Sequence, residues 1–408
     1  MLSEIACYDC FDSKQRVDKR PKHRSEPHIT GHNVQTLAST VSVTRQYQGK
    51  HYPNSLEPMA LVESFVNHPP QGFRTRLINT AQGMAPAFSA PFDILTTLDE
   101  SENAITNALR SSKFIKRFCT LPTLFAGTTV SEYALYPHAN DYSELIVGLF
   151  NEMRLSRSQL LIIKDIPLES PLIDDRGNIS ASRLAHQCKQ AGFSLLTGQA
   201  LAYVPIDFAT IDEYLATRLS HSRRKEFRKK LKSKAELEIL ELRTGDPIFG
   251  DRFLIDELYR MYLNVYEQSK YHFDRLSKEF FVETLNDARN DGVVFVYKRG
   301  GCIIGYNLCF VYNNYLVDKY VGFEYPAARD SNLYFVSWFT NLEYAIKHKL
   351  AYYVAGWTDP EVKTALGASF TLTQHAVYVR NPILRGVVQK FQRFFEPDAN
   401  FLDRSSGK

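Results

Sequence analysis

The chain has 408 residues, of which 44% are hydrophobic and 23% are charged, a composition typical of an ordinary soluble globular protein. Its formal net charge of +4 is too small to indicate a nucleic-acid partner by itself, so we expect no DNA binding. No run reaches the roughly 18 apolar residues that a membrane-spanning helix needs, so we expect no transmembrane segment. A chain of this length usually has more than one hydrophobic core, so we expect two domains.

The N-terminal region, residues 1–40, is polar, lacks periodicity and is expected to be a disordered tail. It has no apolar segment of the kind found in signal peptides. With six cysteines in so long a chain, we expect reduced thiols and a cytoplasmic protein.

Two cysteines and two histidines of this tail have the spacing of a zinc finger: Cys7, Cys10, His23 and His28. Pro21 falls where the helix of a finger would run, and the apolar core of a finger is missing. We therefore favour coincidence and expect no metal site, but the sequence leaves zinc binding open.

Residues 41–207 predict an N-terminal domain of alternating helices and strands. Its expected strands are 41–47, 121–126, 160–166 and 193–205, with further strands and turns at 73–98. Its expected helices are 57–68, 101–118, 143–155 and 181–191, and 171–179 is expected to be a loop.

Residues 208–234 link this domain to the next, and 212–234 predict a single basic helix. Leu215, Leu219, Phe227 and Leu231 form one narrow apolar stripe, and most other positions are Lys or Arg. The simple interpretation is a solvated basic surface. The functional interpretation is capture of the phosphates of coenzyme A, a carrier protein, a nucleotide-linked precursor or RNA.

Residues 235–395 predict a C-terminal domain, followed by a tail at 396–408. We expect helices at 253–266 and 277–289, a hairpin of strands 293–298 and 303–312 around an Arg-Gly-Gly turn, and a strand at 315–323. A helix through 333–346, a strand at 350–354, a helix at 361–366, a strand at 370–379 and a basic helix at 384–395 complete the domain. The alternation predicts parallel strands with crossover helices and a ligand crevice at the strand ends.

The two parts repeat the order helix, strand, helix, strand. The strands FSLLTGQALAYVPI and FTLTQHAVYVRNP both follow a helix that ends in small residues. Sequence identity between them is weak, so chance remains an alternative to duplication, and we favour duplication.

The segments DKYVGFEY, ARDSNLYFVSW, LEYAIKHKL and EVKTALGA resemble the FemAB-like, or BioF2-like, branch of the N-acetyltransferase (GNAT) superfamily. This resemblance implies a mixed α/β fold with two tandem acetyltransferase-like domains, the second better defined. It also implies N-acyl or aminoacyl transfer to an amine of a cell-envelope or polysaccharide precursor, or of a small metabolite. No tightly bound cofactor is implied, and the co-substrate is acyl-CoA or another activated donor on a carrier protein or tRNA.

The candidate catalytic residues are Asp318, Tyr320 and Glu324, since acyl transfer to an amine needs a base and a proton donor for the leaving group. Asp318 and Tyr320 are two residues apart on one strand, which predicts that both face one groove. Each also has an ordinary interpretation: Asp318 and Lys319 as a charge pair at the strand edge, and Glu324 as a loop carboxylate.

The candidate substrate-binding residues are Lys363, Trp357, Arg223 and Arg224. Lys363 matches a lysine that the family places just before a Leu-Gly pair, where it resembles a substrate-positioning cation. Trp357 is expected either to form the floor of the acceptor site or to pack against neighbouring side chains without a role in binding. The two arginines lie in SHSRRKEFRKKL, which is similar to the basic segment that opens the second domain in this family.

The phosphate-binding glycine loop of common acetyltransferases is absent at 327–332, which contains no glycine. The missing loop argues against acetyl-CoA bound in the usual way. It argues less strongly against acyl transfer as the reaction. The alternative is a non-catalytic module of the same fold that binds an anionic partner through the basic helix.

Overall fold

A computed structural model describes residues 52–94, 119–269, 272–382 and 385–386. The following lie outside these residues: the predicted strand 41–47, the predicted helix 101–118, the predicted helix 384–395 except residues 385–386, both tails, and the zinc candidates Cys7, Cys10, His23 and His28.

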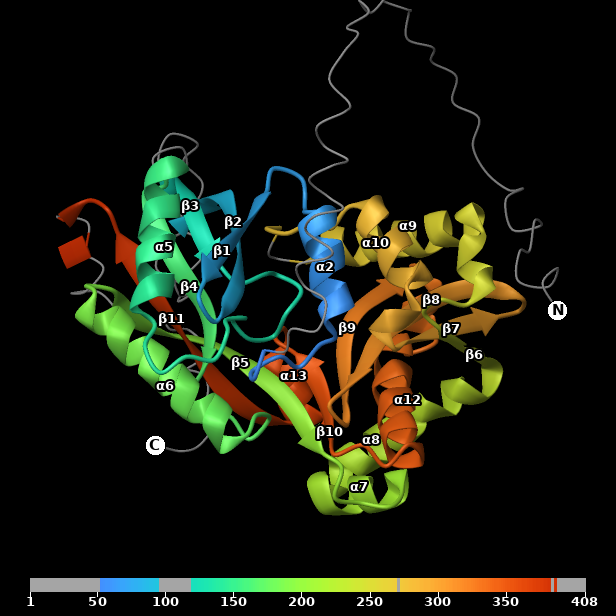
Figure 1. The fold of residues 1–408 in the computed structure, drawn as a ribbon. Coiled ribbons are helices and arrows are strands. Elements are labelled where there is room, and N and C mark those ends of the chain that lie inside the picture. Colours follow the sequence, from blue (N-terminus) through green and yellow to red (C-terminus); the bar gives the residue numbers. More distant parts are fainter. Residues whose placement is uncertain (1–51, 95–118, 270–271, 383–384, 387–408) are drawn as a thin grey trace, which may run out of the picture.

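One mixed sheet forms the centre of the described structure (Figure 1). Its order in the described residues is β1-β2-β3-β4-β11-β5-β10-β9-β8-β7-β6. The strands are β1 (Arg74–Thr80), β2 (Gly83–Asp93), β3 (Thr120–Ala126), β4 (Leu160–Pro167), β5 (Ser194–Pro205), β6 (Glu238–Arg243), β7 (Gly292–Arg299), β8 (Cys302–Tyr312), β9 (Tyr315–Phe323), β10 (Tyr352–Gly356) and β11 (Ser369–Val379). The mixed α/β fold class is therefore as predicted.

Helices cover both faces of this sheet (Figure 1). They are α2 (Met59–Asn67), α5 (Ser143–Leu155), α6 (Asp175–Gln190), α7 (Ile211–Arg218), α8 (His221–Lys230), α9 (Arg252–Gln268), α10 (Lys278–Asn286), α11 (Ala327–Asp330), α12 (Leu333–Lys347) and α13 (Pro360–Ala365). Strand β7 shows how the faces divide: Val294 and Val296 pack with α9 and α10, whereas Phe295 and Tyr297 pack with α12. This alternation follows from the two-residue period of a strand.

The predicted repeat is present in the element order. The first half has α5-β4-α6-β5 and the second has α12-β10-α13-β11. Strands β3 and β4 are parallel, as are β9 and β10, and these pairs occupy matching places in the two halves.

The last strand of each half is exchanged into the other half. Strand β5 pairs with β10 and β11, and β11 pairs with β4 and β5, in each case antiparallel. The two halves consequently share one sheet, and residues from both meet near its middle.

The prediction of one helix over 212–234 is wrong. Helix α7 ends at Arg218, Leu219 is extended (φ −121°, ψ 145°), and α8 begins at His221 and continues as a 3₁₀ turn, Leu231–Glu236. The buried Leu219 side chain packs beside Gly367, where a Cβ added to the glycine would lie 3.1 Å from it. This contact turns the chain, while Leu215, Leu219 and Phe227 are buried as the apolar stripe predicted.

Two smaller predictions also fail. The loop at 171–179 ends early, because the Asp174 carboxylate accepts a hydrogen bond of 2.7 Å from the Gly177 amide and caps α6. Cys119, Cys188 and Cys309 are free thiols, but Cys302 is disulfide-bonded, so the prediction of six reduced thiols fails there.

Candidate active site

Strands β9 and β10 pair in parallel only over their first residues, Tyr315–Val317 with Tyr352–Val354. Asp318 is the next residue on β9, at the point where this pairing ends. Its carboxylate accepts hydrogen bonds from Asn307 Nδ2 (2.7 Å), Asn341 Nδ2 (3.1 Å) and the Tyr353 hydroxyl (2.9 Å). These donors fix its orientation; burial raises the pKa of Asp318, and the hydrogen bonds from Asn307 and Tyr353 act in the opposite direction.

Asp318 and Tyr320 do not face one groove, so this prediction is wrong. A β-bulge at Lys319 pairs Cys309 with Asp318 and Leu308 with Tyr320, which reverses the alternation of side chains. The Tyr320 ring packs against Phe280 and other aromatic rings of α9 and α10, on the face opposite α12. Its hydroxyl is buried and has no hydrogen-bond partner in the part of the chain that the structure describes.

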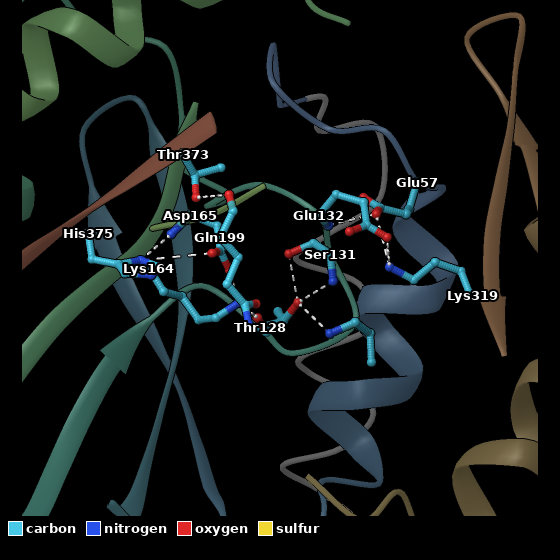
Figure 2. Close-up of polar contacts among 11 residues, drawn as sticks. Glu57, Thr128, Ser131, Glu132, Lys164, Asp165, Gln199, Lys319, Thr373 and His375 are labelled. Atoms are coloured by element: carbon cyan, nitrogen blue, oxygen red, sulfur yellow. Dashed lines mark hydrogen bonds and ion pairs between the residues drawn. The ribbon is translucent and has the colours of Figure 1, made fainter. Parts of the chain in front are cut away.

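Lys319, the bulged residue, reaches into the first half of the chain. Its Nζ lies 2.6 Å from Glu132 Oε1 and 3.2 Å from Glu57 Oε1, as Figure 2 shows. The three side chains are 6%, 2% and 0% exposed, respectively. The expected charge pair of Asp318 with Lys319 is thus replaced by a triad between the halves, which we call the Lys319 triad.

The triad has more acceptor atoms than donors. Glu57 Oε1 also accepts a hydrogen bond from the Glu132 backbone amide at 2.7 Å, but Glu57 Oε2 and Glu132 Oε2 have no partner among the described residues. Burial raises the pKa of Glu57 to about 7, against the opposing effect of Lys319. The triad therefore has a proton-binding group that titrates near neutral pH.

A short loop after β3 places Glu132. The Thr128 hydroxyl accepts the amides of Val130 (3.2 Å) and Ser131 (3.0 Å), and Lys164 Nζ donates to the Thr128 carbonyl at 3.1 Å. Figure 2 shows this loop between the Lys319 triad and the side chain of Lys164. The loop is thus anchored at both ends by side-chain hydrogen bonds.

A second polar group lies on the other side of that loop (Figure 2). Lys164 pairs with Asp165, and the Asp165 amide donates to His375 Nδ1 at 3.0 Å. Burial lowers the pKa of His375. Because Nδ1 is an acceptor here, the neutral ring carries its proton on Nε2 and is not a base at that atom.

Lys363 is buried on α13, only 5% exposed, and its Nζ has no hydrogen bond or ion pair within the described residues. Burial lowers the pKa of Lys363 to about 8, although the charges of Asp318, Glu132 and Asp359 oppose this effect. A Cβ on Gly356 would lie 3.9 Å from this Nζ and 3.8 Å from the Asp318 carbonyl oxygen. The structure therefore brings Lys363 close to the end of the β9–β10 pair.

The remaining predicted site residues lie apart or serve other contacts. Glu324 is ion-paired with Arg260 of α9. Trp357 is partly buried and packs against the apolar cluster that contains Val317 and Val354. Arg223 is exposed and Arg224 partly exposed on α8, and neither forms an ion pair within the described residues.

Most backbone amides just before and at the start of the central helix donate to backbone carbonyls of the same segment. These are the amides of Ala328, Arg329, Asp330, Ser331, Asn332, Phe335 and Val336. Within 328–336, only the amides of Leu333 and Tyr334 have no backbone acceptor in the described structure. Free amides at a helix start are what bind a pyrophosphate. The segment therefore offers two such amides and none of the glycines of the usual loop.

The described residues contain neither a metal-binding cluster nor a membrane-spanning helix. No group of three or more His, Cys, Asp or Glu side chains is arranged to hold a metal ion. No helix in the same part of the chain is long and apolar enough to cross a membrane.

A family model described as FemAB-like, peptidoglycan biosynthesis/recognition, matches residues 178–399, more than half of the chain. The chain belongs to the FemAB-like family. This membership supports a transferase role and leaves the substrate open. No curated protein matches the chain.

Several solved structures have a similar fold. The C-terminal domain of a proposed lysylphosphatidylglycerol synthetase from Agrobacterium fabrum has a TM-score of 0.52 at 10% identity, over 87% of this chain and 96% of that one. FemX has a TM-score of 0.47 at 13% identity (89% and 99%), and a tandem GNAT protein from the clavulanic acid biosynthesis pathway has 0.40 at 11% (85% and 95%). At such identities the first likeness shows the fold alone. That likeness extends over most of both chains.

Sequence reasoning missed two residues of this site, Glu57 and Glu132. They lie 262 and 187 positions from Lys319, and no local pattern connects them. The available signal was Lys319 itself, a cation in a largely apolar strand beside an aspartate, which needs a buried partner.

Proposed function

We propose that this FemAB-like protein transfers an acyl or aminoacyl group from an activated donor to an amine of a cell-envelope precursor. The observation that carries the proposal is Lys363, a buried cation without a partner among the described residues, at the end of the parallel β9–β10 pair. Buried charges are nearly always paired, so an unpaired one supports an anionic or carbonyl ligand. Membership of a family described by peptidoglycan biosynthesis supports the choice of acceptor.

Of the possible donors, we propose aminoacyl-tRNA in preference to acyl-CoA. The segment 327–332 lacks the glycines of the usual pyrophosphate loop, and only the amides of Leu333 and Tyr334 begin the central helix without a backbone acceptor in the described structure. Helix α8 instead presents exposed cations without ion pairs in the described residues, including Lys225, Lys229 and the predicted Arg223. Such a surface suits a phosphate backbone, whose binding is electrostatic. A cytoplasmic site of action forms part of this proposal, since charged tRNA is the donor.

In this proposal Lys363 donates a hydrogen bond to the carbonyl oxygen of the donor as negative charge develops on it. Asp318 does not contact the substrate; its three hydrogen-bond donors hold it in place, and its charge keeps Lys363 more readily protonated. Tyr320 and Glu324, which the sequence suggested as catalytic, are not part of the proposed chemistry, because their side chains lie against α9 and α10.

A thermal-shift titration tests the donor. Purified protein is titrated with aminoacyl-tRNA, uncharged tRNA, a series of acyl-CoAs, free CoA and pyrophosphate, because a ligand of the native state raises the unfolding midpoint by mass action. We expect a rise with tRNA and none with acyl-CoA beyond that with pyrophosphate. A rise specific to one acyl-CoA would contradict the choice of donor.

The non-catalytic alternative keeps a specific observation in its favour, the unpaired cations of α8 in the described structure. It predicts that Lys363→Met leaves both tRNA binding and every other property unchanged. Our proposal predicts that the same change preserves tRNA binding and removes transfer.

A further inference from the structure

Glu132 and Lys363 are two buried side chains of opposite charge, and each has a polar atom without a partner in the part of the chain that the structure describes. Glu132 Oε1 is held by Lys319, but its Oε2 has none. Lys363 Nζ likewise forms no hydrogen bond or ion pair within the described residues. Buried polar atoms are normally satisfied, so two such atoms in one region point to a polar ligand.

The two groups interact across a gap. The negative charge of Glu132 raises the pKa of Lys363 and also that of Asp318. No ion pair within 4.0 Å joins Glu132 to Lys363, however. Their neighbours place them in one region: a Cβ on Gly356 would lie 3.9 Å from Lys363 Nζ and 3.8 Å from the Asp318 carbonyl oxygen, and the next residue, Lys319, contacts Glu132 at 2.6 Å.

The two atoms differ in chemistry in the way that the transfer requires. A carboxylate oxygen accepts a proton, whereas an ammonium group donates a hydrogen bond. We propose that Glu132 is the general base of the transfer, taking the proton of the acceptor amine while Lys363 binds the carbonyl oxygen of the donor. This inference rests on the proposed function.

The step is balanced without a further reactant. The amine nitrogen forms a bond to the carbonyl carbon, and the bond from that carbon to the ester oxygen of the donor breaks. One proton of the amine passes to Glu132, and the leaving oxygen takes a proton from solvent. The product is an amide.

Glu57, the other carboxylate of the Lys319 triad, provides a matched control. It contacts the same Lys319 Nζ and is equally buried. The charges that act on the pKa of Lys363 are those of Asp318, Glu132 and Asp359, and the charge of Glu57 is not among them. Glu57→Gln and Glu132→Gln each remove one carboxyl partner of Lys319. Only Glu132→Gln removes a charge that acts on Lys363.

The first experiment needs no substrate and therefore does not depend on the proposed function. The rate of Lys363 acetylation by acetic anhydride is measured against pH by mass spectrometry in the wild type, Glu132→Gln and Glu57→Gln. Loss of the Glu132 charge should lower the pH midpoint of Lys363 acetylation by up to about one pH unit, and Glu57→Gln should leave this midpoint unchanged. An unchanged midpoint in Glu132→Gln, or equal shifts in both variants, would overturn the pairing of Glu132 with Lys363.

The second experiment uses transfer from aminoacyl-tRNA to peptidoglycan precursors. Glu132→Gln should lower kcat by roughly 10²–10⁴-fold and remove the acidic limb of the pH profile, with Glu132→Asp partly restoring both. Glu57→Gln should keep that limb. Equal losses with unchanged profiles would reduce Glu132 to a structural role, whereas a wild type that transfers nothing would refute the proposed function itself.

Discussion

The ammonium group of Lys319 lies 2.6 Å from a carboxylate oxygen of Glu132, 187 positions earlier in the chain. This ion pair and the one to Glu57 join β9 of the second half to segments of the first half. A substitution of Lys319 should consequently affect the stability of the whole protein.

Lys319→Met leaves two buried carboxylates without their cation. We expect the free energy of unfolding to fall by about 3–5 kcal/mol, the usual cost of breaking a buried pair. Urea denaturation measures this. The control is Lys347→Met, because Lys347 is exposed and pairs loosely with Glu241 at 3.5 Å; it should change stability by less than about 1 kcal/mol. Similar losses in both variants would show that the triad contributes no more than a surface pair.

The stability of the wild type should depend on pH through Glu57. Its pKa is raised to about 7 in the folded state from 4.5, so between these values the folded protein holds a proton that the unfolded chain has released. Stability should therefore decrease as the pH rises from about 4.5 to 7, by roughly 1.4 kcal/mol for each unit of pKa difference as an upper bound. Glu57→Gln should remove this decrease. A variant with the same dependence as the wild type would assign the effect to another group.

Gly367 should not tolerate a side chain. Its φ is +89°, and a Cβ would lie 3.0 Å from Arg218 Cβ and 3.1 Å from Leu219. Gly367→Ala should lower the free energy of unfolding by about 1–3 kcal/mol, because both the backbone and the contact are strained. Gly250→Ala is the control, since a Cβ at this position would have no described atom within 4 Å. An unaltered unfolding midpoint in Gly367→Ala would mean that the turn relaxes freely.

Charge reversal on α8 tests the donor surface. The double change Arg223→Glu and Arg224→Glu should weaken tRNA binding and make it less sensitive to salt, since fewer counterions are released. Lys189→Glu, on the exposed surface of α6, is the control. Binding measured at several salt concentrations separates them, and equal weakening by the control would show that the net charge of the protein, rather than α8, is responsible.

Much of the fold was predictable because it depends on local patterns. The period of apolar residues located α5, α9 and α12, and the Arg-Gly-Gly turn located the β7–β8 hairpin. The prediction failed where distant contacts decide the local structure. Leu219 interrupts the basic helix because it packs on Gly367, which comes much later in the chain.

The candidate site was less predictable for the same reason. Lys363 and Asp318 were candidates because they lie in the segment that resembles the family, and the structure places both at the end of the β9–β10 pair. The two-residue period of a strand predicted the wrong face of the sheet for Tyr320, because a single bulged residue reverses the direction of the side chains that follow it. Glu57 and Glu132 become part of the site only through the shared sheet that unites the halves.

We propose that the chain transfers an activated acyl group to the amine of an acceptor, at a site where Lys363 binds the carbonyl oxygen of the donor. The most direct measurement follows label from aminoacyl-tRNA into peptidoglycan precursors with the wild type and with Lys363→Met, which keeps the buried volume but removes the cation. We predict labelled precursor with the wild type and a loss of at least about 10²-fold in the variant, with an unfolding midpoint and tRNA affinity close to those of the wild type. Equal transfer by the two proteins, or none by the wild type, would contradict this account.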